Sequence, residues 1–388
     1  MVNLSEKLNL TRCLVVCAAL LSSAAFAELP VETVPAVEKL DADYPQSMVF
    51  AHDANFEALI AGRVVLVDVA PDNRHYKGAL DASQFPSFTE SGVRGELYVA
   101  ETHYSRGTRG ERTDVISIYD RETLGQTGEI FLPGAKRGLV VVNRYSLQLV
   151  DSDRYMFVFN FTPAASITMI DVAERKILSE TQIPGCALAY PTGERGFSSL
   201  CSNGTFVSVQ FDKAGQVVSR EVTQSFFDVD QDPLFDKPVY VDQTAYFQTF
   251  KGQIYPVDLS GSVAKVGKPW SMLSSAEAKE GWRPGGWQIG TASDAGLVYV
   301  LMSPDGKDGS HKDGGSEAWV YDPVERERVN RISLKNWSVS LEVTRGDEPY
   351  LVATNADMQL DVYEAKSGEW IRVIGGAGAM PLNLHAVR

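Results

Sequence analysis

The chain has 388 residues and a formal net charge of −14, with 50 acidic side chains against 36 Lys and Arg. An acidic chain lacks the basic footprint that nucleic acid binding requires, and it is poorly suited to anionic lipid surfaces. We therefore expect no nucleic acid and no membrane among its partners, whereas a basic protein partner is compatible with this charge.

The N-terminal residues 1–27 have the pattern of an export signal. Lys7 and Arg12 precede a short apolar run, and Ala25-Phe26-Ala27 supplies the small residues that a signal peptidase accepts. The alternative is a membrane anchor, but the run is shorter than the roughly 20 apolar residues of a spanning helix. We expect a cleaved signal and a periplasmic protein, with an N-terminal arm over 28–46 and one domain over 47–388.

Removal of the signal leaves Cys186 and Cys201 as the only cysteines. They flank a segment with Pro and Gly that looks like a hairpin turn, and an exported protein meets an oxidising compartment. We expect a disulfide between them; the alternative is two unpaired buried thiols. With no histidine nearby, the two cysteines do not form a zinc site.

One strand pattern recurs along residues 47–388. Each copy is an alternating, β-branched run that ends at an acidic residue and is followed by polar residues and glycine, as in a hairpin turn. The seven copies end at Asp68, Asp120, Asp171, Asp212, Asp258, Asp322 and Glu364.

Further strand-like runs between the copies leave room for about four strands in each interval. We predict an all-β fold, a seven-bladed β-propeller with four-stranded antiparallel blades. A β-sandwich would not need this length, and a β-helix would show a shorter repeat. The only short helix that we single out is Ser275–Glu280, with Ser274 or Ser275 as its cap.

Motifs that carry chemistry are scarce. No two histidines have a metal-ligand spacing, and neither a haem-attachment motif nor a nucleophile elbow occurs. Residues 303–315 contain spaced aspartates but lack the order of a calcium loop, which favours an exposed connection between strands. Phe56, Trp282 and Trp287 indicate core or interface packing. We expect no catalytic residue, no metal site and no cofactor in this chain, and therefore a scaffold for a catalytic partner.

Three segments resemble the heavy subunits of the methylamine and aromatic-amine dehydrogenases. Arg109–Asp120 is similar to an early-blade signature of that family, and Gly281–Gln288 is similar to a second hallmark. Pro304–Lys312 resembles a loop of the aromatic-amine branch in particular. Cys186 and Cys201 fall where the disulfide within a blade of the family would be.

The resemblance implies a heterotetramer of two heavy and two light subunits, with tryptophan tryptophylquinone on the light subunit. It implies oxidation of a primary amine to an aldehyde and ammonia, with electrons passing to a small blue copper protein. Phe56 would line the mouth of the substrate channel, and the arm would reach over a partner subunit.

Since the hallmarks come from both branches, the identity of the amine stays open. The alternative function is a stand-alone periplasmic propeller that binds a ligand or a protein. A propeller enzyme with its own metal is disfavoured because no ordered set of His, Asp and Glu is present.

Overall fold

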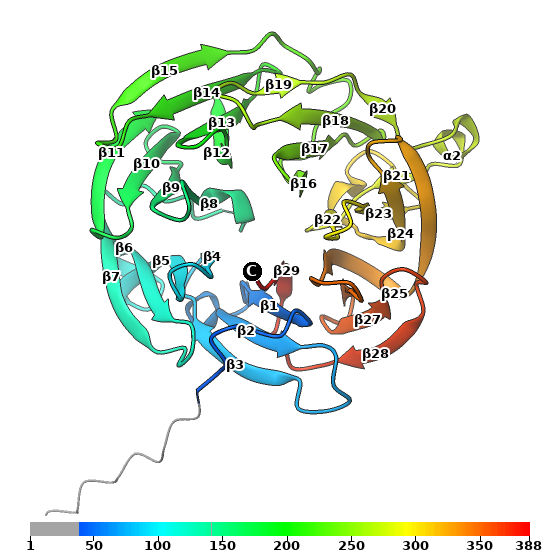
Figure 1. The fold of residues 1–388 in the computed structure, drawn as a ribbon, viewed down its shortest axis with the longest axis horizontal. Helices are drawn as coiled ribbons and strands as arrows, with labels where there is room; N and C mark the ends of the chain where they lie inside the picture. The colour runs from blue at the N-terminus through cyan, green and yellow to red at the C-terminus, as the bar shows by residue number, and fades with distance from the viewer. Residues whose placement is uncertain (1–38, 141) are drawn as a thin grey trace, which may run out of the picture. The chain divides into compact units, whose positions relative to one another are not determined.

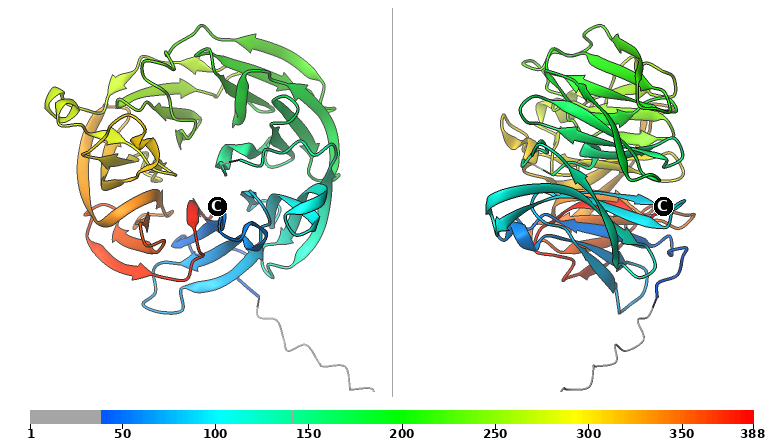
Figure 2. Two further views of the ribbon diagram at one scale, coloured as in Figure 1. Left: turned by 180° about the vertical axis from the view of Figure 1, so that it is seen from behind. Right: turned by 90° about the vertical axis from the view of Figure 1, so that its left-hand side faces the viewer.

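Residues 39–388 fold into a ring of antiparallel β-sheets around a central axis (Figure 1). The computed structural model describes residues 39–140 and 142–388. The expected signal, 1–27, and residues 28–38 of the expected arm lie outside this range. Figure 2 shows the ring from behind and from the side. No helix in the described ranges has the length and apolar character needed to cross a bilayer.

Five separate blades make up most of the ring, and all but the first are built only from strands that follow one another in sequence. The first blade has the order β29 (Pro381–Ala386), β1 (Met48–Asp53), β2 (Arg63–Asp68), β3 (Tyr76–Asp81). The second blade contains β4 (Ser87–Ser91), β5 (Glu96–Arg106), β6 (Arg109–Asp120) and β7 (Gln126–Leu132). The third contains β8 (Leu147–Val150), β9 (Tyr155–Asn160), β10 (Ser166–Asp171) and β11 (Lys176–Gln182). The fourth blade contains β12 (Cys186–Pro191), β13 (Gly196–Cys201), β14 (Phe206–Phe211) and β15 (Val217–Val222). The fifth contains β16 (Val239–Val241), β17 (Thr244–Gln248), β18 (Gln253–Asp258), β19 (Lys265–Val266) and β20 (Trp270–Ser271).

The rest of the ring is one continuous eight-stranded sheet, and this corrects the expectation of seven separate blades. Its strands are β21 (Arg283–Pro284), β22 (Gly290–Ala292), β23 (Val298–Ser303), β24 (Gly315–Asp322), β25 (Glu327–Val343), β26 (Tyr350–Asn355), β27 (Leu360–Glu364) and β28 (Trp370–Ile374).

The long strand β25 is the physical reason for the difference. Its residues up to Ser333 pair with β24, and those beyond Ser338 pair with β26. Ser338 itself pairs with Gly315 of β24 and with Asn355 of β26, so the pairing continues across the sheet. The last two copies of the sequence pattern, which end at Asp322 and Glu364, therefore lie in one sheet. The all-β propeller and its antiparallel, mostly four-stranded blades agree with the prediction.

Helices are few and short in the described part of the chain. They are α2 (Ser275–Lys279) and the 3-10 turns η1 (Leu59–Ala61), η2 (Arg144–Ser146) and η3 (Ser310–Lys312). The expected helix near residue 275 is present, and the side chain of Ser274 caps it.

The hydrophobic core lies between neighbouring sheets because alternate residues of each strand face opposite sides. One apolar cluster joins Phe50 and Leu66 of the first blade to Phe88 and Leu97 of the second. Similar clusters join the other neighbours around the ring. The acidic residues that end the repeats hold the following turns, as Asp171 does by accepting the backbone N–H of Glu174 at 2.9 Å.

The ring closes where the C-terminal strand β29 pairs with β1, so that both ends of the described chain share one blade (Figure 1). Ala51 lies opposite Leu384 in this pairing. Residues 39–46, the described part of the expected arm, lie against the second blade. There the Tyr44 hydroxyl donates to the carbonyl of Arg121.

Antiparallel blades give the ring two distinct faces, because successive connections alternate between them. The β1–β2 and β9–β10 loops and the links from one blade to the next lie on one face, which we call the aromatic face. The β12–β13, β16–β17 and β25–β26 turns lie on the opposite face, which we call the cavity face.

Candidate functional site

An aromatic cluster of Phe56, Phe85 and Trp287 lies on the aromatic face. Phe56 comes from the β1–β2 loop, Phe85 from the link between the first two blades, and Trp287 from the segment before β22. The ring centre of Phe56 is 6.1 Å from that of Phe85 and 5.6 Å from that of Trp287. All three side chains are half-buried. The cluster is thus an accessible apolar surface assembled from three distant parts of the sequence.

Lys237 adds a cation beside this cluster. Its Nζ lies 5.1 Å from the ring centre of Trp287 and donates a 2.6 Å hydrogen bond to the Trp287 carbonyl. Burial lowers the pKa of Lys237, although the neighbouring Asp236 opposes that shift. Burial raises the pKa of Asp236 in turn. The hydrogen bond from Lys237 thus helps to fix the position of Trp287.

Further exposed apolar side chains lie on the same face. They lie in the β1–β2 and β9–β10 loops, in links between blades and in the middle of β25: Ile60, Val140, Phe161, Val229 and Trp337. Exposed apolar groups that gather on one face are typical of surfaces that bind another protein.

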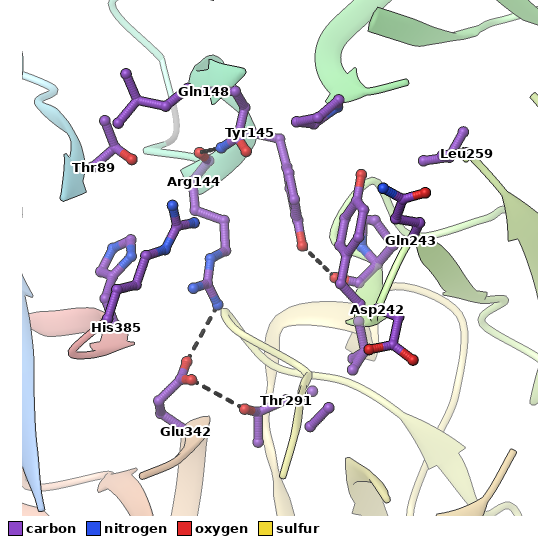
Figure 3. A pocket seen from close by; sticks show the side chains of 18 of the residues that line it. Thr89, Arg144, Tyr145, Gln148, Asp242, Gln243, Leu259, Thr291, Glu342 and His385 are labelled. Carbon is purple, nitrogen blue, oxygen red and sulfur yellow. Dashed lines mark hydrogen bonds and ion pairs between the residues drawn. The ribbon is translucent and has the colours of Figure 1, made fainter. Parts of the chain in front are cut away.

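A second site lies on the ring axis, where the innermost strands surround a cavity of about 350 Å³ (Figure 3). Its lining includes Gly193, Asp242, Gln243 and Arg345 from turns of the cavity face. The cavity therefore opens on the face opposite to the aromatic cluster.

An ion pair crosses this cavity. Arg144, from η2, reaches Glu342 of β25 with 3.2 Å between Nη1 and Oε2 (Figure 3). Glu342 also accepts from Gln288 Nε2 at 2.6 Å and from Thr291 Oγ1 at 3.1 Å. Burial acts to lower the pKa of Arg144, but the charge and hydrogen bond of Glu342 raise it above its usual value. The Glu342 carboxylate thus accepts from three donors across the axis of the ring.

Two histidines lie buried beside the cavity. His52 and His385 have ring centres 6.3 Å apart, and no partner among the described residues bonds to either Nε2. Burial lowers the pKa of His52 to about 4 and also lowers that of His385. Nowhere in 39–140 or 142–388 do three or more His, Cys, Asp and Glu side chains gather so as to hold a metal ion.

Comparison with known proteins decides the family. The sequence model of the methylamine dehydrogenase heavy chain (MADH) matches residues 49–386. The chain belongs to this heavy-chain family. The methylamine dehydrogenase heavy chain of Methylophilus methylotrophus is 26% identical over 307 residues, which cover 78% of this chain and 75% of that protein. That of Paracoccus versutus is 28% identical over 288 residues, which cover 73% and 66%.

A solved structure shares the fold alone. The chain resembles a protein from Lactobacillus plantarum with a TM-score of 0.59 and 11% identity, over 88% of this chain and 99% of that one.

The two later heavy-chain segments, Gly281–Gln288 and Pro304–Lys312, pack on each other beside the aromatic cluster. Two backbone hydrogen bonds of 2.9 Å join them, from Gly306 to Gly281 and from Gly286 to His311. A side chain on Gly286 would place its Cβ 2.6 Å from the carbonyl of Val339, so only glycine fits there. The two segments thus form the support that presents Trp287.

The other sequence-predicted residues are found as follows. Cys186 and Cys201 form the expected disulfide and lie opposite each other on β12 and β13. Phe56 lies in an aromatic cluster, as a residue at a channel mouth would, but its role in a channel stays a prediction. Sequence reasoning missed Phe85 and the Arg144–Glu342 pair. No local motif marks them, and 198 residues separate Arg144 from Glu342.

Proposed function

We propose that this chain is the heavy, cofactor-free subunit of a periplasmic quinone-dependent amine dehydrogenase. The assembly contains two heavy and two light subunits. It oxidises a small primary amine to an aldehyde and ammonia and passes the electrons to a blue copper protein. When bound in the light subunit, tryptophan tryptophylquinone supplies the electron sink for this oxidation.

The match to the heavy-chain family over residues 49–386 carries this proposal. The exposed apolar groups of the aromatic face support it, since they suit a protein partner. In the proposed assembly, Phe56, Phe85 and Trp287 border the path by which the amine reaches the light subunit. The half-buried rings would exclude water from that path and contact the apolar part of the amine.

Co-purification from the native source tests the proposal. We expect a small exported protein to elute with this chain, to appear in mass spectra, and to give the visible absorbance of a quinone. The chain produced alone should show no quinone band and no amine-dependent reduction of a dye.

Two results would contradict the proposal. Amine oxidation by the isolated chain would place the catalytic centre here rather than on a partner. A native preparation that contains this chain alone, with no quinone band, would favour the stand-alone binding protein instead.

A further inference from the structure

The central cavity lies apart from the aromatic cluster that the proposed function assigns to the path of the amine. It opens on the cavity face, whereas the aromatic cluster and the surrounding apolar groups lie on the other face. Its volume of about 350 Å³ is within the range of small-molecule sites. Its inner wall contains two arginines and two tyrosines from different sheets: Arg144, Tyr145, Tyr240 and Arg388.

Several hydrogen-bond donors of this cavity are not used by the protein. Glu342 already accepts from three donors, and Arg144 reaches it through Nη1 alone. Among residues 39–140 and 142–388, no acceptor is hydrogen-bonded to the Arg388 guanidinium. That side chain remains accessible to water although protein surrounds it, since it borders the cavity. A guanidinium presents five N–H donors, so most donors of the two arginines are free.

The hydroxyl of Tyr240 adds a further unused donor. It is buried and lacks a partner within the described ranges. The ring of Tyr240 lies 5.8 Å from that of Tyr145, whose hydroxyl is already bonded to the carbonyl of Pro238 at 2.5 Å. A buried polar group without a partner costs free energy, which a bound ligand would recover.

The Arg388 guanidinium forms no salt bridge with a carboxylate of the described residues. Arg345 is held at the rim by Asp294, with 2.9 Å between Nη1 and Oδ1. Burial lowers the pKa of Arg388, and Arg144 and Arg345 lower it further, whereas Asp153 and Glu90 oppose the shift. Asp242, at the cavity mouth, is the remaining carboxylate of the lining.

We propose that the central cavity binds a small oxyanion, a carboxylate or a phosphate, between the guanidinium groups of Arg144 and Arg388 with the Tyr240 hydroxyl as a third donor. An oxyanion matches this site because its oxygens accept from guanidinium forks and hydroxyls at once. Its negative charge also relieves the repulsion between the two arginines. The proposal does not depend on the amine dehydrogenase assignment.

Calorimetric titration of the full chain, or of its native complex, tests the site at low ionic strength. The probes are inorganic phosphate and succinate, with sodium chloride at matched ionic strength as the reference. We expect saturable binding of at least one probe at up to about 10 mM, and the stronger of the two identifies the ligand class. No saturable heat from either probe would overturn the proposal.

Two variants test whether the binding occurs in the cavity. Arg388→Gln should weaken binding about tenfold or more, and Tyr240→Phe should weaken it about threefold to tenfold. Tyr240→Phe removes only a hydroxyl without a partner, so it should fold normally. The matched control is Arg326→Gln, an exposed arginine in the β24–β25 turn of the same face. Binding that is unchanged in both cavity variants, or lowered equally in the control, would also overturn the proposal.

Discussion

Single residues on the ring axis connect sheets that are far apart in sequence. Arg144 belongs to the third blade and Glu342 to the eight-stranded sheet, yet they form an ion pair across the cavity (Figure 3). The other two donors of Glu342, Gln288 and Thr291, come from the segment that leads into β22 and from β22 itself. The Glu342 carboxylate therefore connects its own strand, β25, with the third blade and with the region of β22.

Replacement of Glu342 should destabilise the ring. Glu342→Gln leaves the partly buried Arg144 without its charged partner, and we expect a loss of about 2 kcal/mol in the free energy of unfolding. Urea denaturation measures it. The control is Glu122→Gln, which breaks an exposed pair with Lys39 and should cost less than about 1 kcal/mol. Equal losses in the two variants would show that the axial pair contributes nothing beyond a surface contact.

Phe56 allows a test of the aromatic cluster in the proposed assembly. If the cluster borders the path of the amine, Phe56→Ala should change KM for a primary amine by about fivefold to tenfold and leave kcat within about twofold. Phe131→Ala, which removes an exposed aromatic ring on the outer strand β7, is the control. Steady-state kinetics with an artificial electron acceptor gives both constants. An unchanged KM in Phe56→Ala would remove Phe56 from the path.

Among the secondary-structure elements, α2 shows how local sequence fixes a local structure. Ser274 and Glu277 form a capping box at its N-terminus, in which the Ser274 backbone N–H donates to Glu277 Oε2 at 2.9 Å. Arg328 reaches the other oxygen of Glu277 at 2.7 Å and so connects this short helix to β25.

The pKa of Glu277 predicts a pH dependence. Burial acts to raise it, but hydrogen bonds from Arg328 and Ser274 dominate and lower it to about 2, from an ordinary value of 4.5. Because the folded-state pKa is depressed, the stabilisation is present above pH 4.5 and is lost as the pH falls toward 2. Glu277→Gln should flatten the loss of stability between these two pH values, as measured by urea unfolding at each pH. Glu280→Gln, at the exposed end of α2, should keep the wild-type slope.

The disulfide between β12 and β13 should stabilise the folded chain against unfolding. Cys186 and Cys201 are 15 residues apart, and closing a loop of that length is worth about 3 kcal/mol in the chain-entropy model. The double variant Cys186→Ala/Cys201→Ala should lower the free energy of unfolding by about that amount. A reducing agent should destabilise the wild type alone. If the reducing agent lowers the stability of the double variant by the same amount, its effect on the wild type does not come from breaking the disulfide.

At the scale of the whole molecule, local pattern predicted the strands, whereas long-range pairing decided the sheets. Alternation in runs such as Val64–Asp68 predicted a strand, because a strand with one buried face must alternate. The sequence of β25 has neither Gly nor Pro between Ser333 and Ser338, so nothing local showed where its pairing changes from β24 to β26. The axial cavity was also unpredictable, since residues from every sheet form it.

The pairing of β29 with β1 leads to a prediction for the ring as a whole. Leu384 is fully buried in the cluster that joins the first blade to the eight-stranded sheet. Leu384→Ala should therefore cost about 3 kcal/mol, whereas Val373→Ala, at an exposed position on β28, should cost less than about 0.5 kcal/mol.

Deletion of residues 381–388 is the stronger test of closure. It removes β29, leaves the inner edge of β1 without a hydrogen-bonded neighbour, and uncovers the axial cavity. Because β1 also supplies core residues against the second blade, the effect should spread beyond one blade. We expect the shortened chain to lose its cooperative unfolding transition and to aggregate through the open strand edge, as seen by circular dichroism and size-exclusion chromatography. A monomeric shortened chain that unfolds at the wild-type urea concentration would show that the ring is stable without its C-terminal strand.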